Sequence, residues 1–227
     1  ILFIFCGTEF LDKLRMKEWV FNMNRDYNKF NSIHMDVLKE LGNIGAGNAI
    51  TSLSKMLNKK IDMKVPKAKI VEIKEVSEIL GDAENLVVGI LFKMSGDING
   101  DMLFILQYES AHLLVNMLLG NDYSEEKEDF TDMEMSALKE VGNILIGSYL
   151  SALATLTNLK ITPSIPDIAI DMSGAVISYP AIQFGKMGDS ILYIETEFVE
   201  GTKKVLGDFL LIPDIESFDL LLNTLGV

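Results

Sequence analysis

The sequence is poor in the residues that build covalent or metal cross-links. Cys6 is the only cysteine, so no internal disulfide can form within this chain. A chain without disulfides fits a reducing compartment, and we expect a cytoplasmic protein. The two histidines, His34 and His112, have no cysteine or acidic partner at metal-ligand spacing, and we expect no metal site.

Long apolar runs and basic charge are also scarce. The apolar stretch "ILFIFCG" at 1–7 is too short to span a bilayer and lacks the basic leader of a secretory signal. Acidic residues outnumber basic ones by 33 to 20, which gives a net charge of −13. Because nucleic acid and anionic membranes repel an acidic protein, we expect no nucleic-acid partner and no membrane insertion.

What the chain does contain is an internal repeat. A shift of one hundred residues sets "KELGNIGAGNAI" (39–50) on "KEVGNILIGSYL" (139–150), and the segments 103–120 and 209–226 also match. Such self-similarity predicts a duplicated domain. The residues that recur around the first segment without a gap are Leu38, Lys39, Glu40, Gly42, Asn43, Ile44 and Gly47, as Leu138, Lys139, Glu140, Gly142, Asn143, Ile144 and Gly147.

The repeat predicts the domain organisation. Residues 1–30 are treated as an N-terminal extension of unknown role, and residues 121–130 as an acidic linker. The two repeats, 31–120 and 131–227, are expected to form one compact pseudo-symmetric domain.

Both repeats show the same order of elements. A long helix is expected from near Ser32 to Asn58 and from Thr131 to Asn158, where Thr131 and Glu134 form a capping box. We therefore expect an α/β fold, internally duplicated about a pseudo-two-fold axis, with two long helices packed with a mixed six-stranded sheet. The predicted strands are 67–75, 85–94, 101–107, 167–172, 190–198 and 208–214, and the predicted closing helices are 110–119 and 215–225.

Each long helix carries a second stripe beside its apolar face. Apolar residues such as Val37, Leu41 and Ile44 are expected to face the sheet. Residues three and four positions apart align along a different face. That stripe contains Asp36, Glu40, Asn43, Gly47, Thr51 and Ser54 in the first repeat, and Ser136, Glu140, Asn143, Gly147, Ser151 and Ala154 in the second.

Two interpretations of this stripe compete. An isolated Glu–Asn pair is usually a solvated helix face, but its recurrence in otherwise diverged halves favours a functional site. We expect Gly47 and Gly147 to leave room for a large molecule, and Gly42 and Gly45 to allow tight internal packing.

The stripe belongs to a longer pattern: Asp or Ser, three residues, Glu, two residues, Asn, twenty-two residues, Pro. Asp36, Glu40, Asn43 and Pro66 fit it, and Ser136, Glu140, Asn143 and Pro166 fit it again. With these two copies of the pattern, the sequence resembles the CheC/CheX/FliY family of bacterial chemotaxis phosphatases over residues 32–227. Two complete copies suit the CheC branch, since the CheX branch carries one site per chain and FliY an additional switch domain.

The resemblance implies a phosphatase whose substrate is the phosphorylated response regulator CheY, which carries an aspartyl phosphate. Asn43 and Asn143 would orient the attacking water, and Glu40 and Glu140 would pair with the lysine of the regulator's pocket. Asp36, Ser136, Gly47 and Gly147 would support docking, while Pro66 and Pro166 would shape the connection from helix to strand.

The resemblance implies no cofactor held by this chain; Mg²⁺ is expected in the regulator's own acidic pocket. The receptor deamidase CheD is expected as a second partner. Two alternatives stay open: a non-catalytic adaptor that binds CheD, or a CheX/FliY-type relative.

Overall fold

Two helices of equal length dominate the structure, which is a computed structural model. α2 spans Ser32–Leu57 and α5 spans Asp132–Thr157, in agreement with the predicted long helices. The chain divides into two units, Ile1–Ser32 and Ile33–Val227, and the fold that follows is that of the second. The predicted extension 1–30 and residues 121–128 of the predicted linker lie outside the described residues, which are 32–57, 60, 62–120, 129–183, 190–200 and 203–226.

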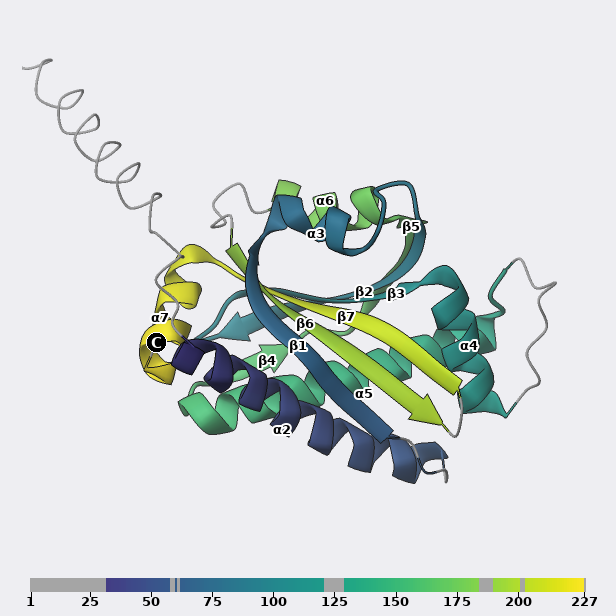
Figure 1. Ribbon diagram of the computed structural model, residues 1–227, viewed down its shortest axis with the longest axis horizontal. Helices are drawn as coiled ribbons and strands as arrows, with labels where there is room; N and C mark the ends of the chain where they lie inside the picture. Colours follow the sequence, from purple (N-terminus) through teal and green to yellow (C-terminus); the bar gives the residue numbers. More distant parts are fainter. Residues whose placement is uncertain are drawn as a thin grey trace, which may run out of the picture. The chain divides into compact units, whose positions relative to one another are not determined.

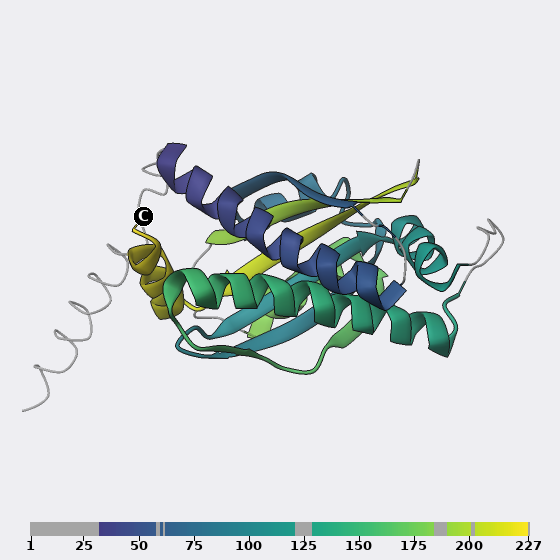
Figure 2. The ribbon, with the colours of Figure 1, turned by 90° about the horizontal axis from the view of Figure 1, so that it is seen from below.

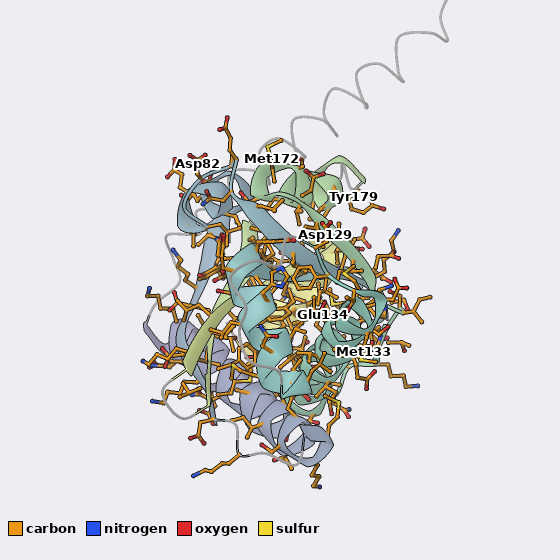
Figure 3. All side chains as sticks on the ribbon, turned by 90° about the vertical axis from the view of Figure 1, so that its right-hand side faces the viewer. Asp82, Asp129, Met133, Glu134, Met172 and Tyr179 are labelled. Atoms are coloured by element: carbon orange, nitrogen blue, oxygen red, sulfur yellow. The ribbon has the colours of Figure 1, made fainter. Side chains whose placement is uncertain are left out.

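The start of α5 is fixed by the predicted capping box. The backbone N–H of Glu134 donates to Thr131 Oγ1 at 3.4 Å, and the backbone N–H of Thr131 donates to Glu134 Oε2 at 2.8 Å. Glu134, labelled in Figure 3, is buried as a result, whereas its neighbour Met133 is exposed. The helix ends at Asn158, whose φ of 57° is the left-handed conformation common after a helix. Because the cap fixes the residue at which α5 begins, it also fixes where the stripe residues of α5 stand along the helix.

The described residues contain one sheet of seven strands, in the order β1-β6-β7-β3-β2-β4, with β5 also paired to β2. Every pairing is antiparallel, so the duplicated α/β fold is confirmed but the expected mixed, six-stranded sheet is wrong in those two details. The strands are β1 (Asp62–Glu72), β2 (Leu86–Gly96), β3 (Gly100–Gln107), β4 (Ile161–Pro163), β5 (Asp167–Met172), β6 (Ser190–Glu200) and β7 (Lys203–Pro213).

The antiparallel arrangement has a simple cause. β2–β3 and β6–β7 are hairpins, which need only short turns, whereas a parallel pair needs a crossover of a dozen or more residues. β3 and β7, each the second strand of its hairpin, pair side by side in opposite directions. Phe104 of β3 and Phe209 of β7 are paired opposite each other in these two central strands, and the centroids of their stacked rings are 4.4 Å apart.

The outer strands are exchanged between the repeats. β1 of the first repeat pairs with β6 of the second, and β4 and β5 of the second repeat pair with β2 of the first. Pro66 lies inside β1, where the register shifts between Lys64 and Lys67, and Pro166 lies between β4 and β5. The prediction that these prolines shape a helix-to-strand connection is therefore wrong. They interrupt the outer strands, because proline has no N–H to donate to the ladder.

Helices cover both faces of the sheet (Figure 1). α2 and α5 cover one face, and two helices absent from the sequence prediction, α3 (Ile73–Ile79) and α6 (Ser173–Gln183), lie on the other. The repeats close with α4 (Tyr108–Leu119) and α7 (Ile215–Leu225), close to their predicted bounds. None of the described helices combines the length and the apolar character that crossing a membrane would require.

The sheet face under α3 and α6 carries two acidic residues at matching positions of the repeats. Each follows a glycine, as Gly100-Asp101 in β3 and Gly207-Asp208 in β7. Asp101 is buried without a hydrogen bond to its carboxylate, and burial raises its pKa to about 6. Burial likewise raises the pKa of Asp208 to about 6, although the Tyr193 hydroxyl donates to its carboxylate at 2.5 Å.

Two candidate active sites on the long helices

The buried face of α2 is built largely from small residues. Leu41 and Leu53 are buried as expected for core positions, but Val37 and Ile44 are only half-buried. Between the two leucines, the residues against the sheet and α5 are Gly42, Gly45, Ala46 and Ala49. The helix therefore approaches its neighbours closely, and its stripe of Glu and Asn faces outward.

The glycines of the two helices divide into two groups. A Cβ on Gly42 would lie 3.0 Å from Val65 Cγ1, and one on Gly45 would lie 2.6 Å from Tyr149 Cδ1. The predicted packing role of Gly42 and Gly45 is confirmed. A Cβ on Gly47 or on Gly147 would meet nothing within 4 Å, so the helix surface there is open.

The acid and amide side chains of both stripes reach solvent. Asp36, Glu40, Asn43 and Gly47 are exposed on α2. On α5, Ser136, Glu140 and Asn143 are exposed in the same arrangement, and Gly147 is half-exposed. The structure thus brings the sequence-predicted residues together on the surface of each helix, and none of the eight is sealed inside the domain.

The two stripes differ in their hydrogen bonds. Asn143 Nδ2 donates to Glu140 Oε2 at 3.5 Å, which leaves the amide oxygen of Asn143 available as an acceptor. The hydroxyl of Ser136 donates to the carbonyl of Asp132 one turn earlier, at 2.8 Å. Its proton is engaged by its own helix, so Ser136 can offer a docked molecule only acceptor lone pairs. Asp36, in the matching position, offers a carboxylate.

Both candidate sites lie on the same side of the domain. α2 and α5 run antiparallel and side by side across one face of the sheet (Figure 2). They touch where Gly45 of α2 meets the ring of Tyr149 of α5. Each Glu–Asn pair precedes this contact along its own helix, so the two pairs lie on either side of it.

The groups available on the stripes are carboxylates, neutral amides and hydroxyls. Among the residues that the structure describes, no group of three or more His, Cys, Asp or Glu could hold one metal ion. The carboxylates, amides and hydroxyls of the stripes can form hydrogen bonds, carry negative charge and position a water molecule.

One pair of residues received no role from the sequence pattern, although it recurs in both repeats. Lys39 and Lys139 are exposed and immediately precede the two glutamates. The signal that could have marked them is their recurrence beside the Glu–Asn pairs.

Comparison with known proteins agrees with this geometry. The model of the CheC-like family matches residues 33–70 and 133–170, which contain both stripes. The chain is 38% identical over 203 residues to the CheY-P phosphatase CheC of Bacillus subtilis strain 168, covering 88% of this chain and 97% of that relative.

The fold is shared with solved structures of FliY and of a FliG–FliM complex. The crystal structure of Thermotoga maritima FliY superposes with a TM-score of 0.69 at 21% identity, covering 87% of this chain and 98% of that one. A chain of the FliG–FliM complex from H. pylori superposes with a TM-score of 0.66 at 12% identity, covering 86% and 100%. The match to the family model and the identity to the Bacillus subtilis relative over nearly its full length show that the chain belongs to the CheC-like family.

Proposed function

We propose that this chain hydrolyses the aspartyl phosphate of a phosphorylated CheY response regulator in the cytoplasm. The observation that carries the proposal is the exposure of both Glu–Asn pairs, each next to an open helix surface at Gly47 or Gly147. The identity to a relative named CheY-P phosphatase CheC supports the choice of substrate.

In this proposal Asn43 and Asn143 orient the attacking water. In-line hydrolysis of a phosphoryl group requires a positioned water and charge stabilisation, with little covalent chemistry from the enzyme. The amide oxygen accepts a hydrogen bond from the water, and the amide carries no charge that would repel the phosphoryl group. A carboxylate in its place would face an anion. The amide of Asn143, held through its nitrogen by Glu140, has its oxygen available for this task.

Glu40 and Glu140 fix the docked geometry by pairing with a lysine of the regulator's phosphorylation pocket. Each lies one turn before its asparagine, so one docked surface can reach both side chains. Asp36 and Ser136 support docking one turn earlier, and Gly47 and Gly147 let the regulator approach the helix. Any Mg²⁺ in the reaction is assigned to the regulator's acidic pocket.

The required acceleration is modest because an acyl phosphate is already reactive. Each tenfold increase in rate needs a barrier lower by about 1.4 kcal/mol. Positioning one water in line for attack can supply one or two such steps.

The test is the rate of phosphate loss from purified phosphorylated CheY with wild type, Asn43→Ala, Asn143→Ala and the double variant. We expect partial loss for each single change and near-complete loss for both. Asn48→Ala is the matched control, because Asn48 is exposed on α2 but stands about 140° around the helix from Asn43. A double variant that hydrolyses at the wild-type rate contradicts the proposal.

Binding of CheD is a separate proposal, based on the resemblance. The double asparagine variant separates the two roles, because a scaffold function does not need the water-positioning amides. CheD captured equally by wild type and by the inactive variant would assign CheD binding to another surface.

A further inference from the structure

Building on the phosphatase function proposed above, we propose that Lys39 and Lys139 are docking residues that bind the phosphoryl group of the regulator. They would make each site select the phosphorylated form. Both lysines are exposed on their helices, and both stand four residues before an asparagine of the candidate sites.

The arrangement around each helix places the amide between two opposite charges. At about 100° per residue, Asn43 lies about 40° from Lys39 on one side and about 60° from Glu40 on the other. The same holds for Asn143 between Lys139 and Glu140. Each site therefore presents a cation, a neutral amide and an anion in that order.

This order matches the chemistry of the docked surface. The regulator pocket of the proposed function offers an anionic phosphoryl group and a cationic lysine side by side. The glutamate of each site forms an ion pair with the regulator's lysine. The ammonium of Lys39 or Lys139 can then bind the phosphoryl oxygens. A lysine suits this contact because its compact charge sits on a long flexible stem. Without the phosphoryl group, the ammonium would lose its partner.

Helix stabilisation by ion pairs along the same helix does not explain why a lysine stands at both positions. Exposed lysines commonly stabilise helices by pairing with an acid three or four residues away. The residues at those distances from Lys139 include no acid: they are Met135, Ser136, Gly142 and Asn143. Lys39 has only Asp36 within that range.

Intrachain ion pairs do not account for them either. The ion pairs found in the described part of the chain include Lys67 with Glu195 and Lys204 with Glu197, all on the sheet. Neither Lys39 nor Lys139 has an acidic partner among the described residues. Two unpaired cations at matching positions in a chain of net charge −13 offset the repulsion that Asp36 and the glutamates would exert on a phosphoryl group.

The experiment measures kcat and KM for hydrolysis of phosphorylated CheY by the double variant Lys39→Ala, Lys139→Ala, at low and at moderate salt. We expect KM to rise about tenfold, kcat to change less than about twofold, and the salt dependence of kcat/KM to weaken. Lys39→Arg with Lys139→Arg should restore most of the affinity, because the positive charge is kept. If the two lysines had a purely structural role, their substitution would not raise KM while it leaves kcat nearly unchanged.

The matched control is Lys55→Ala with Lys160→Ala, which changes the net charge equally. Both lysines are exposed and lie off the stripes, at the end of α2 and just before β4. If this control raises KM as much as the Lys39→Ala, Lys139→Ala variant does, the effect comes from net charge alone and the inference is overturned.

The asparagine variants separate failure of the inference from failure of the proposed function. If they lose activity while the Lys39→Ala, Lys139→Ala variant keeps wild-type KM and salt dependence, the lysine inference is wrong and the phosphatase assignment stands. If the asparagine variants hydrolyse at the wild-type rate, the proposed function fails and the lysine inference fails with it.

Discussion

Gly45 of α2 lies against the aromatic ring of Tyr149 of α5, with room for a hydrogen but not for a methyl group. A Cβ at position 45 would stand 2.6 Å from Cδ1 and 2.9 Å from Cγ of the tyrosine. Tyr149 is itself buried, and its ring centroid lies 4.7 Å from that of Phe209. The contact therefore joins both long helices and the centre of the sheet.

This contact predicts opposite effects for two alanine substitutions on one helix. Gly45→Ala should lower the free energy of unfolding by about 1–3 kcal/mol, because overpacking against the ring outweighs the gain in helix propensity. Gly47→Ala should raise it by up to about 1 kcal/mol, because nothing opposes the gain. Urea denaturation of both variants and wild type checks the prediction. Equal stability of the two variants would contradict the packing argument.

The open surface at Gly47 predicts that a large side chain there blocks docking without unfolding the protein. In an Asn143→Ala background, where only the first site remains, Gly47→Trp should lower phosphatase activity at least about tenfold. Tryptophan is a better helix former than glycine, so stability should not fall. The reciprocal pair is Gly147→Trp in an Asn43→Ala background. Unchanged phosphate release in both cases would show that docking occurs elsewhere.

Asp101 predicts that the protein loses stability as pH rises towards neutrality. Burial raises its pKa from 3.8 to about 6 in the folded chain, so the folded state binds this proton more tightly than the unfolded state. Its contribution to the free energy of unfolding is present in full below pH about 4. It is lost as pH rises through about 6, and the loss is on the order of 2 kcal/mol.

The measurement compares urea denaturation of wild type and Asp101→Asn at about pH 5 and about pH 7. The asparagine variant should be less sensitive to pH, while the remaining dependence reflects Asp208, whose raised pKa acts with the same sign. Identical pH dependence in the two proteins would contradict the assigned role of Asp101.

The exchange of outer strands predicts that neither repeat folds alone. A polypeptide of residues 33–120 contains β1 but not β6, the strand with which β1 pairs. Its partner, residues 129–227, contains β4 and β5 but not β2. Each fragment by itself should lack cooperative unfolding, and co-expression should restore a 1:1 complex with phosphatase activity. Cooperative unfolding of either fragment as a monomer would contradict the prediction.

The features predicted correctly from the sequence are those that depend on residues close together in the chain or on the internal repeat. The gapless repeat revealed both long helices, and helical periodicity placed Glu40 and Asn43 on one exposed face. The capping box at Thr131 was visible because it involves residues only three apart.

The features that were missed depend on distant contacts or on weak local signals. α6 contains Pro180 and α3 has only seven residues, so neither gives a clear helical signal. Strand patterns carry no information on direction, so they could not show that every strand pairing in the described sheet is antiparallel. The contact of Gly45 with Tyr149 joins residues more than one hundred positions apart, and no periodicity could show it.

That contact also has a consequence for how the duplicated chain can evolve. The repeat counterparts of Gly45 and Tyr149 are Leu145 and Ala49, so the bulky and small partners have traded places. In a symmetric dimer of identical subunits, every substitution would appear in both subunits. A Gly–Tyr contact whose repeat counterparts have their bulky and small residues exchanged could not arise there. Joining the two halves in one chain removes that constraint, so each long helix can change independently of its counterpart in the other repeat.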